Sequence, residues 1–389
     1  EVVVIETAGF VASGYESVAD AWSEDPLGLD TGGTSLAVYR HGQLVLDLWG
    51  GTDPISRRPW ERESCAIVFS CTKAVTAVAL LRLVDRGLVD LDAPVARYWP
   101  EFARNGKGAI TVRHVLTHRS GLPSLGITDR RELLDPIAMA AMLADRSPVH
   151  PPGRHWLYHA LSFGYLLGEI VRRVTGRSIG TLIQDEISGP LGLDLWIGTP
   201  TERGADFRPA HSARPLALSA EPDDPIVAAA WLGVREVLEL AIPQPGEDRG
   251  GEFINSRRFR AAEIAAGNGV ATARSLARFY AACIGEVDGI RLLSADLLDE
   301  ATTDQAGGTT VAPGQTERMH YGLGLDLAYR ENPMLGPHSF GHAGMGGRLA
   351  FADRHSGLAV GYVSTELRFG ESPDRRWMPL LAALRAVAG

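Results

Sequence analysis

Lysine is nearly absent from this sequence: only Lys73 and Lys107 occur among 389 residues, against 36 arginines. Cysteine is also scarce. Cys65, Cys71 and Cys283 are odd in number and lack the spacing of metal ligands, which argues against a disulfide framework and against a zinc site. So few cysteines are typical of a protein from a reducing compartment, and we expect a cytoplasmic location.

The sequence also lacks any apolar run of 18 residues and any run of basic residues. Together with a net charge of −9, this excludes a membrane span and gives no support for nucleic acid as a partner. The first ten residues do not have the pattern of a signal peptide, although the absence of an initial Met leaves an earlier, removed segment open. The oligomeric state is not readable from the sequence.

Several motifs of common enzyme classes are missing. The sequence has no G-x-S-x-G nucleophile elbow, no H-E-x-x-H zinc motif, no EF-hand loop, no Walker loop and no Rossmann fingerprint. We therefore expect neither a bound metal nor a cofactor, and the expected partner is a small molecule.

Segments with clear periodicity are present near the amino terminus. Residues 15–22 have the pattern of a short helix, and TSLAVYRHGQLVLDLWGG predicts two strands joined by a hairpin at His41 and Gly42. A largely apolar helix follows Ser70 and ends at Gly87. Because apolar residues lie on most of its faces, we expect this helix to be central and buried.

The rest of the sequence changes from helices to strands. From about residue 88 to 193 the pattern predicts mostly short helices and loops, including SFGYLLGEIVRRVTG with its stop at Gly176. TARSLARFYAACIG is a further helix, and HSFGHAGMGGRLAFADRHSGLAVGYVSTE predicts two or three antiparallel strands. The last residues predict a helix with Ser372 as N-cap and Pro373 in its first position, whereas residues 201–260 have no clear pattern.

Strands near both ends, with helices between them, predict an α+β fold in which the two ends build one antiparallel sheet. We expect residues 1–85 and 265–389 to form an α/β domain with this central sheet flanked by helices. Residues 86–264 would form an inserted, mainly helical domain with loops. The active site is expected in the cleft between the two domains.

Ser70 and Lys73 are the first candidates for chemistry. Residues three apart on a helix share one face, and Ser70 would lie at the helix start, where free N–H groups stabilise negative charge. A serine hydroxyl becomes a good nucleophile only when a base takes its proton. A buried lysine with a lowered pKa could be that base, or could hold a second base deprotonated. The spacing of Ser70 and Lys73 is by itself a weak signal, because it can arise by coincidence. The position of the pair at the start of a buried helix strengthens the signal.

Two further segments carry weaker signals. Tyr158, in PPGRHWLYHALSFGYLLGEI, precedes a buried helix, where a tyrosine is more often a packing anchor than a catalyst. The glycine-rich segment FGHAGMGGRLAF lets the backbone approach a ligand closely, but a lone glycine cluster is more often a plain hairpin. His342, within that segment, could be structural as easily as functional.

Taken in chain order, three segments resemble the S-x-x-K, Y-x-N and K-T-G boxes of serine β-lactamases and penicillin-binding proteins: Ser70–Lys73, Tyr158–Ala160 and His342–Gly344. The segments LAVYRHGQLVLDLWGG, VDLDAPVARYWPEF, ITVRHVLTHRSGLP and GNGVATARSLARFYA are similar to those of the family VIII carboxylesterases, which are esterases on the class C β-lactamase fold. The resemblance runs from about residue 33 to 365 and is weakest over residues 201–260. It implies a class C β-lactamase-like fold.

The resemblance implies a serine hydrolase of the carboxylesterase type. Ser70 would be the acylating nucleophile, and Lys73 and Tyr158 would form the general base. Tyr158 would take the serine proton as a phenolate favoured by Lys73, and would later activate the hydrolytic water, although the order in which the two residues act is open. The backbone N–H groups of Ser70 and Met345 would form the oxyanion hole.

Two departures from the family pattern bear on the substrate. His342 replaces the lysine with which β-lactamases hold the acidic group of the antibiotic, and Ala160 replaces the asparagine that contacts its amide. Both changes favour small, uncharged esters over β-lactams, while His342 could still donate a hydrogen bond near the substrate carbonyl. Gly344 and Trp156 are expected beside His342 as further substrate-binding residues.

The leading hypothesis is an esterase that cleaves short-acyl carboxylic esters and has weak β-lactamase side activity. A β-lactamase or D-amino-acid peptidase on the same fold is an alternative. An acyltransferase is another, since an alcohol can replace water in resolving an acyl-enzyme. A non-catalytic scaffold with the same fold has the least support, because Ser70, Lys73 and Tyr158 are all present.

Overall fold

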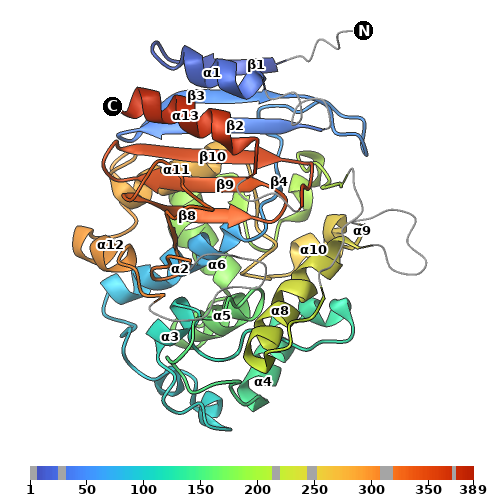
Figure 1. Cartoon of the computed structure of the whole chain (residues 1–389), viewed down its shortest axis with the longest axis vertical. Coiled ribbons are helices and arrows are strands. Elements are labelled where there is room, and N and C mark those ends of the chain that lie inside the picture. Colours follow the sequence, from blue (N-terminus) through green and yellow to red (C-terminus); the bar gives the residue numbers. More distant parts are fainter. Residues whose placement is uncertain (1–6, 25–31, 213–219, 243–251, 307–318, 370–373) are drawn as a thin grey trace.

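A seven-stranded antiparallel sheet, built from both ends of the chain, forms one half of the molecule in the computed structural model (Figure 1). The structure describes residues 7–24, 32–212, 220–242, 252–306, 319–369 and 374–389. In spatial order the strands are β1 (Thr7–Val11), β3 (Gln43–Gly50), β2 (Thr34–Arg40), β10 (Leu358–Ser364), β9 (Arg348–Asp353), β8 (Ser339–Gly344) and β7 (Asp326–Leu327). The two chain ends meet where β2 pairs with β10, with Ala37 opposite Gly361.

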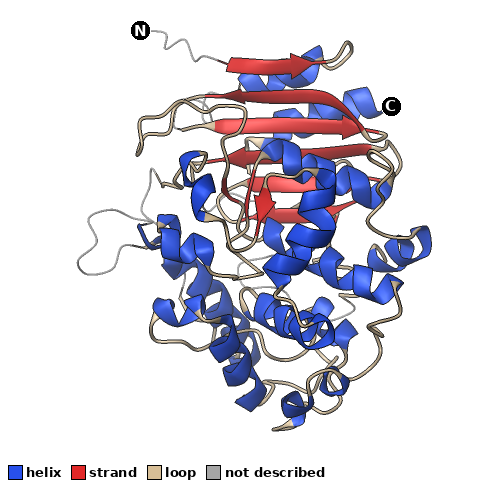
Figure 2. Cartoon of the chain, turned by 180° about the vertical axis from the view of Figure 1, so that it is seen from behind, coloured by secondary structure: helices blue, strands red, loops and turns tan. Residues whose placement is uncertain are grey.

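Side chains alternate between the two faces of this sheet. On β2, Leu36 and its neighbour Ala37 belong to different hydrophobic clusters, as the period of two in a strand requires. The cluster with Leu36 is covered by α1 (Glu16–Ser23) and α13 (Trp377–Ala388), which lie side by side on the sheet (Figure 1). The opposite face is covered by α11 (Ala273–Ile284), and Figure 2 shows helices in front of the sheet in the view from behind.

The other half of the molecule is mainly helical (Figures 1 and 2). Its central element is α2 (Cys71–Asp85), which packs against β8 and against α5 (Ser162–Thr175). The remaining α-helices are α3 (Val112–Leu116), α4 (Pro136–Asp145), α6 (Ile179–Ile183), α7 (Gly189–Leu191), α8 (Pro225–Leu238), α9 (Glu252–Asn255), α10 (Arg257–Ala261) and α12 (Ala295–Ala301). Short 3₁₀-helices are η1 (Val95–Arg97), η2 (Pro100–Ala103), η3 (Arg130–Leu134), η5 (Thr201–Ala205) and η6 (Glu239–Ala241), and η4 (Gln184–Ser188) is a π-helix.

A second, smaller sheet joins the two halves. Its order is β4-β6-β5, with β4 (Ala66–Ile67) just before α2, β6 (Val270–Ala271) just before α11, and β5 (Leu195–Trp196). The strand β5 lies inside the region predicted to be helical, so a sheet connects the two predicted domains. The division of the chain into those domains stays a prediction.

Most of the predicted elements are confirmed, and so is the α+β fold. The helix after Ser70 is α2, the hairpin at His41 is β2 and β3, and the strands of the C-terminal third are β8, β9 and β10. The last helix begins later than predicted: it starts at Trp377, while Ser372 and Pro373 lie outside the described residues. Within the described ranges, no helix has the length and apolar character needed to cross a membrane.

Candidate active site

Ser70 lies where the chain passes from β4 into α2, as the N-cap residue of that helix. The preceding Phe69 has a φ of +45°, a left-handed conformation that is rare outside glycine and is often found at functional sites. In the turn that follows, the Cys71 N–H donates to Val68 O and the Thr72 N–H donates to Phe69 O. Within the described part of the chain, the Ser70 N–H meets no hydrogen-bond acceptor. The turn thus leaves a partly exposed hydroxyl and a free N–H at a helix start.

Lys73 lies one turn further along α2 and is fully buried. Its Nζ atom is 2.7 Å from the Ala160 carbonyl O, 2.9 Å from the Ala266 carbonyl O and 3.2 Å from Ser70 Oγ. Burial disfavours the ammonium form and lowers the pKa of Lys73 from 10.5 to about 7. A neutral amine has two N–H donors, which suit the two carbonyls, and one lone pair, which then faces the Ser70 hydroxyl. The amine can therefore accept the Ser70 proton near neutral pH.

Tyr158 comes from the loop before α5 and lies beside the same pair. Lys73 Nζ is 4.9 Å from the centre of the Tyr158 ring, and Ser70 is near enough to the Tyr158 hydroxyl to lower its pKa. Burial, followed by the nearby Asp326, raises the pKa of Tyr158 above its ordinary value of 10, and the influence of Ser70 only partly offsets this. The raised pKa favours the neutral phenol over the phenolate that the resemblance implies.

Buried rings hold the loop that carries Tyr158. His118 is fully buried, its Nδ1 accepts the His159 N–H at 3.1 Å, and its ring centre is 4.9 Å from that of Tyr158. Trp156 is only 2% exposed, and its ring centre is 6.3 Å from that of Tyr158. Trp156 thus packs behind Tyr158, and its predicted contact with a substrate stays a prediction.

Strand β8 brings the third predicted segment against the start of α2. The Cys71 Sγ–H donates to the His342 carbonyl O at 3.1 Å. A Cβ atom at Gly344 would lie 2.3 Å from the Val68 carbonyl O and 3.2 Å from Cys71 Sγ. Only glycine permits so close an approach, which is why this residue lies next to the segment that carries Ser70.

The turn after β8 presents a second free N–H group. The Gly347 N–H donates to the Gly344 carbonyl O at 3.1 Å, which closes the turn. Because a peptide unit is planar and trans, the Met345 N–H of the same unit points away from that bond. Among the described residues it meets no acceptor, as is also true of the Ser70 N–H. The structure therefore brings the two predicted oxyanion-hole donors to adjacent segments.

His342 differs from its predicted behaviour. The side chain is 2% exposed, and its Nδ1 is 2.7 Å from the Ala343 carbonyl O, which can only accept, so Nδ1 carries the proton. Burial, followed by the charge of Lys73, lowers the pKa of His342 to about 3, and the ring is neutral. In this tautomer Nε2 is an acceptor, which corrects the expectation that His342 donates a hydrogen bond near the substrate carbonyl.

Asp326, on the short strand β7, is a residue that the sequence analysis missed. Its Oδ2 is 3.5 Å from His342 Nδ1 and 3.4 Å from the Ala343 N atom. Burial raises the pKa of Asp326 to about 7, and the Asp326 charge in turn raises the pKa of Lys73. A signal was available, because a carboxylate inside the apolar run GLGLDLAY is rarely buried without a partner.

Together these segments assemble a hydroxyl, an amine with a lowered pKa, a phenol and two free backbone N–H groups. That set suits acyl transfer, in which a serine attacks a carbonyl carbon and its oxygen gains charge. No group of three or more His, Cys, Asp or Glu side chains among the described residues is arranged to hold a metal ion.

The sequence is similar to those of known proteins along most of its length. The model of the family described as Beta-lactamase matches residues 23–385. The chain belongs to the beta-lactamase family. A curated relative, the esterase/beta-lactamase LipL of Mycobacterium tuberculosis, is 38% identical over 349 residues, which cover 86% of this chain and 77% of LipL. The esterase EstB of Burkholderia gladioli is 30% identical over 386 residues, which cover 91% of this chain and 89% of EstB.

A solved structure extends the likeness to the whole fold. The crystal structure of a family VIII carboxylesterase has a TM-score of 0.86 to this beta-lactamase family member at 31% identity, covering 98% of this chain and 100% of the other. The predicted resemblance to family VIII esterases and the predicted β-lactamase fold are therefore confirmed. The protein is a hydrolase of the esterase/β-lactamase family.

Proposed function

We propose that this protein is a carboxylesterase that hydrolyses short-acyl, uncharged esters through a covalent Ser70 acyl-enzyme. The observation that carries the proposal is the Lys73 amine, 3.2 Å from Ser70 Oγ, with two backbone carbonyls to take its N–H groups. This geometry supports a base that accepts the serine proton without needing a second ionised group.

In the proposed first half-reaction, Lys73 takes the Ser70 proton while Oγ attacks the ester carbonyl carbon. The N–H groups of Ser70 and Met345 stabilise the oxyanion of the tetrahedral intermediate. The bond to the alcohol then breaks, and the proton passes from Lys73, through the Tyr158 hydroxyl, to the leaving alkoxide. In the second half-reaction Lys73 takes a proton from water as the water oxygen attacks the acyl carbon. The acyl–Oγ bond then breaks, Lys73 returns the proton to Ser70 Oγ, and the carboxylic acid leaves.

The neutral state of His342 supports an uncharged substrate. Burial keeps its pKa at about 3, so the site has no cation where β-lactamases have a lysine. A carboxylate on the substrate would therefore lack its counter-charge, and Ala160 has no side-chain amide to offer. The names of EstB and of the family VIII carboxylesterase also support an ester substrate.

A second candidate activity is the hydrolysis of β-lactams. It is favoured by LipL, whose name includes both esterase and beta-lactamase. Under the proposal, this reaction would be a slow side activity with a kcat/KM for nitrocefin below that for p-nitrophenyl butyrate. The reverse order would favour the second candidate over the first.

Labelling with a fluorophosphonate probe tests the proposed nucleophile. We expect the wild-type protein to hydrolyse p-nitrophenyl acetate and butyrate and to carry the probe on Ser70, located by peptide mass spectrometry. Ser70→Ala should lose ester turnover by at least about 10³-fold, because no other group replaces the attacking oxygen.

The matched control is Ser212→Ala, an exposed serine whose hydroxyl donates to the Leu367 carbonyl O at 3.4 Å. This variant should keep both labelling and turnover. Full turnover in a folded Ser70→Ala protein, or a probe adduct elsewhere in the wild type, would remove Ser70 from the mechanism.

The pH dependence tests which group accepts the proton. With the pKa of Lys73 at about 7, the neutral amine gains population as the pH rises, so kcat/KM should increase through about pH 7. Asp326 raises that pKa, and Asp326→Asn should lower it, moving the acid limb of the profile toward lower pH. Stopped-flow or initial-rate profiles from about pH 5 to 9 measure this shift.

Asp353→Asn is the control for that shift. Asp353 is a buried carboxyl on β9 that accepts hydrogen bonds from Ser339 and Ser356. Its replacement should leave the acid limb in place. If the acid limb of the kcat/KM profile of Asp326→Asn were unchanged or lay at higher pH, Lys73 could not be the titrating base.

A further inference from the structure

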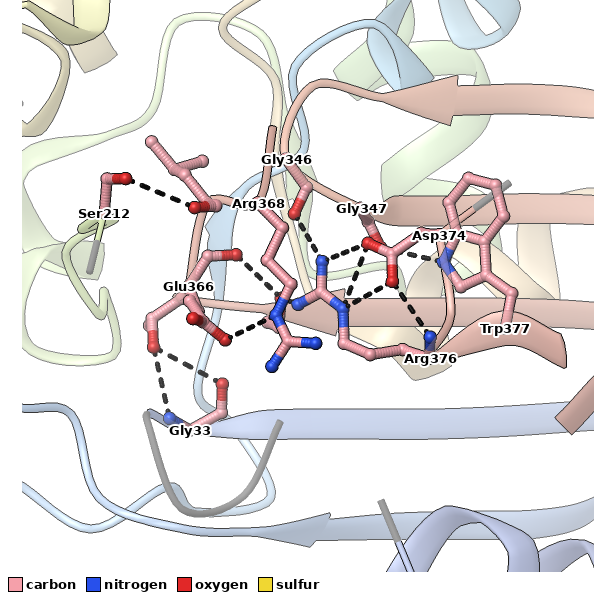
Figure 3. Close-up of polar contacts among 12 residues, drawn as sticks. Gly33, Ser212, Gly346, Gly347, Glu366, Arg368, Asp374, Arg376 and Trp377 are labelled. Atoms are coloured by element: carbon pink, nitrogen blue, oxygen red, sulfur yellow. Dashed lines mark hydrogen bonds and ion pairs between the residues drawn. The ribbon is translucent and has the colours of Figure 1, made fainter. Parts of the chain in front are cut away.

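The turn that follows β8 is held by side chains from the C-terminal segment (Figure 3). Arg376 Nη2 donates to the Gly346 carbonyl O at 2.7 Å, and the Trp377 Nε1–H donates to the Gly347 carbonyl O at 3.0 Å. Arg348, at the start of β9, also donates to the Gly346 carbonyl O, at 3.2 Å. Two consecutive carbonyls of the turn are therefore fixed by three side-chain donors.

The guanidinium that reaches the turn is itself held in one orientation. Arg376 is 2% exposed, and Asp374 accepts from its backbone N–H at 2.9 Å, from its Nε at 3.0 Å and from its Nη2 at 2.5 Å. Arg376 Nη1 donates to Ser364 Oγ, at the end of β10, at 3.2 Å. Because the group is planar and its donors are used on several sides, the buried charge is both compensated and rigidly placed.

The fit between the turn and this ion pair is close. Gly347 has a φ of +96°, and a Cβ atom there would lie 1.8 Å from Arg376 Nη2 and 2.3 Å from Asp374 Oδ2. Figure 3 shows the Arg376 and Asp374 side chains directed at Gly346 and Gly347. With so little free space, a displacement of the guanidinium moves the turn backbone as well.

We propose that Arg376 and Trp377 are positioning residues for the oxyanion hole. By holding the carbonyls of Gly346 and Gly347, they keep the Met345 N–H directed at the place where the substrate oxygen gains charge. The inference rests on the proposed ester hydrolysis, since it concerns the tetrahedral intermediate of that reaction. Both side chains are buried, so they act through the turn and not by touching the substrate.

The stage of the reaction at which the Met345 N–H binds the substrate oxygen determines which kinetic constant should change. A preorganised donor stabilises the oxyanion, which exists only in the transition state and the intermediate, more than the ester ground state. Loosening the turn should therefore lower kcat and leave KM nearly unchanged. A residue that only stabilises the fold would lower the unfolding temperature without this split.

Trp377→Phe removes the N–H donor to Gly347 and keeps an aromatic ring. Its matched control is Trp22→Phe, because Trp22 is buried in the same hydrophobic cluster and its Nε1 has no partner among the described residues. Both changes remove the same volume from that cluster. We expect Trp377→Phe to lower kcat for p-nitrophenyl butyrate about tenfold with KM changed less than about twofold, and Trp22→Phe to leave both constants unchanged.

A second pair of variants tests the guanidinium. Arg376→Lys keeps the charge but loses the planar fork, and we expect the same fall in kcat. Its control is Arg385→Lys, because Arg385 lies on α13, the helix that Arg376 precedes as N-cap residue. Arg385 also donates to backbone carbonyls, those of Met334 and Leu335, away from the turn. This control should keep the wild-type kcat.

The affinity of a trifluoromethyl ketone analogue of the ester gives an independent readout. Addition of Ser70 to the ketone forms a tetrahedral adduct whose oxygen uses the same hole, so its inhibition constant should rise by the factor by which kcat falls. An unchanged inhibition constant, or a kcat loss in Trp377→Phe no larger than in Trp22→Phe, would overturn the proposal. Absence of ester turnover and of Ser70 labelling in the wild type would instead overturn the proposed function, which keeps the two failures distinct.

Discussion

Lys73→Met is expected to lower kcat for p-nitrophenyl butyrate by on the order of 10²–10⁴-fold while the protein stays folded. Methionine has nearly the same length and volume, but its thioether is not basic, so the Ser70 hydroxyl keeps its proton. Lys73→Arg should be equally impaired, because a guanidinium remains protonated in proteins and cannot accept one. Single-turnover kinetics with p-nitrophenyl butyrate, alongside circular dichroism of each variant, would measure the effect on acylation.

The sequence supplies a matched control for this experiment in its one other lysine, Lys107. Lys107 is also fully buried, and its Nζ donates to the Arg104 carbonyl O at 2.7 Å and to the Arg146 carbonyl O. Lys73→Met leaves the buried carbonyls of Ala160 and Ala266 without this donor, at a cost of about 1–3 kcal/mol of unfolding free energy for each carbonyl. Lys107→Met removes the side-chain donor from the Arg104 and Arg146 carbonyls, and the Arg104 carbonyl O still accepts from the Lys107 backbone N–H. Both variants should lose stability, but only Lys73→Met should lose turnover. More than a tenth of the wild-type kcat in Lys73→Met would rule out its role as the base.

Gly344→Ala is expected to lower kcat by on the order of 10²–10³-fold, the usual cost of losing one oxyanion donor. The added Cβ would lie 2.3 Å from the Val68 carbonyl O, so β8 must move away from the start of α2. The Met345 N–H moves with the strand and no longer shares a site with the Ser70 N–H. The rate of fluorophosphonate labelling should fall along with kcat, since the same hole receives the phosphonyl oxygen.

Gly108→Ala is the control for this substitution, because the nearest atom to an added Cβ at Gly108 is 4.0 Å away. That variant should match the wild type in turnover, and thermal unfolding should show whether either alanine disturbs the fold. If folded Gly344→Ala retained wild-type kcat, the oxyanion site could not lie between β8 and the start of α2.

The features that depend on local pattern were predictable from the sequence. The helix after Ser70 and the hairpin at His41 follow from periodicity and turn residues, which act over a few positions. The relation of Ser70 to Lys73 was readable for the same reason, since helix geometry alone places residues three apart on one face.

The electrostatic state of the site was not predictable in this way. The tautomer of His342 depends on the position of the Ala343 carbonyl, and the neutral phenol of Tyr158 depends on burial among groups that are distant in sequence. Asp326 and Arg376 were missed because their contacts form only when β7, β8 and α13 come together. Such shifts in pKa and such carbonyl contacts have no signature in residue spacing.

The pairing of β2 with β10 has a consequence for biosynthesis. Ser70 and Lys73 are translated early. The strand β8, which carries Gly344, and the strand β10, which pairs with β2, are translated much later. A nascent chain on the ribosome thus carries its nucleophile beside an open sheet edge, which other chains can pair with. Joining such distant segments is slow, and under the proposed mechanism ester hydrolysis begins only after β8 and the turn that follows it have been made.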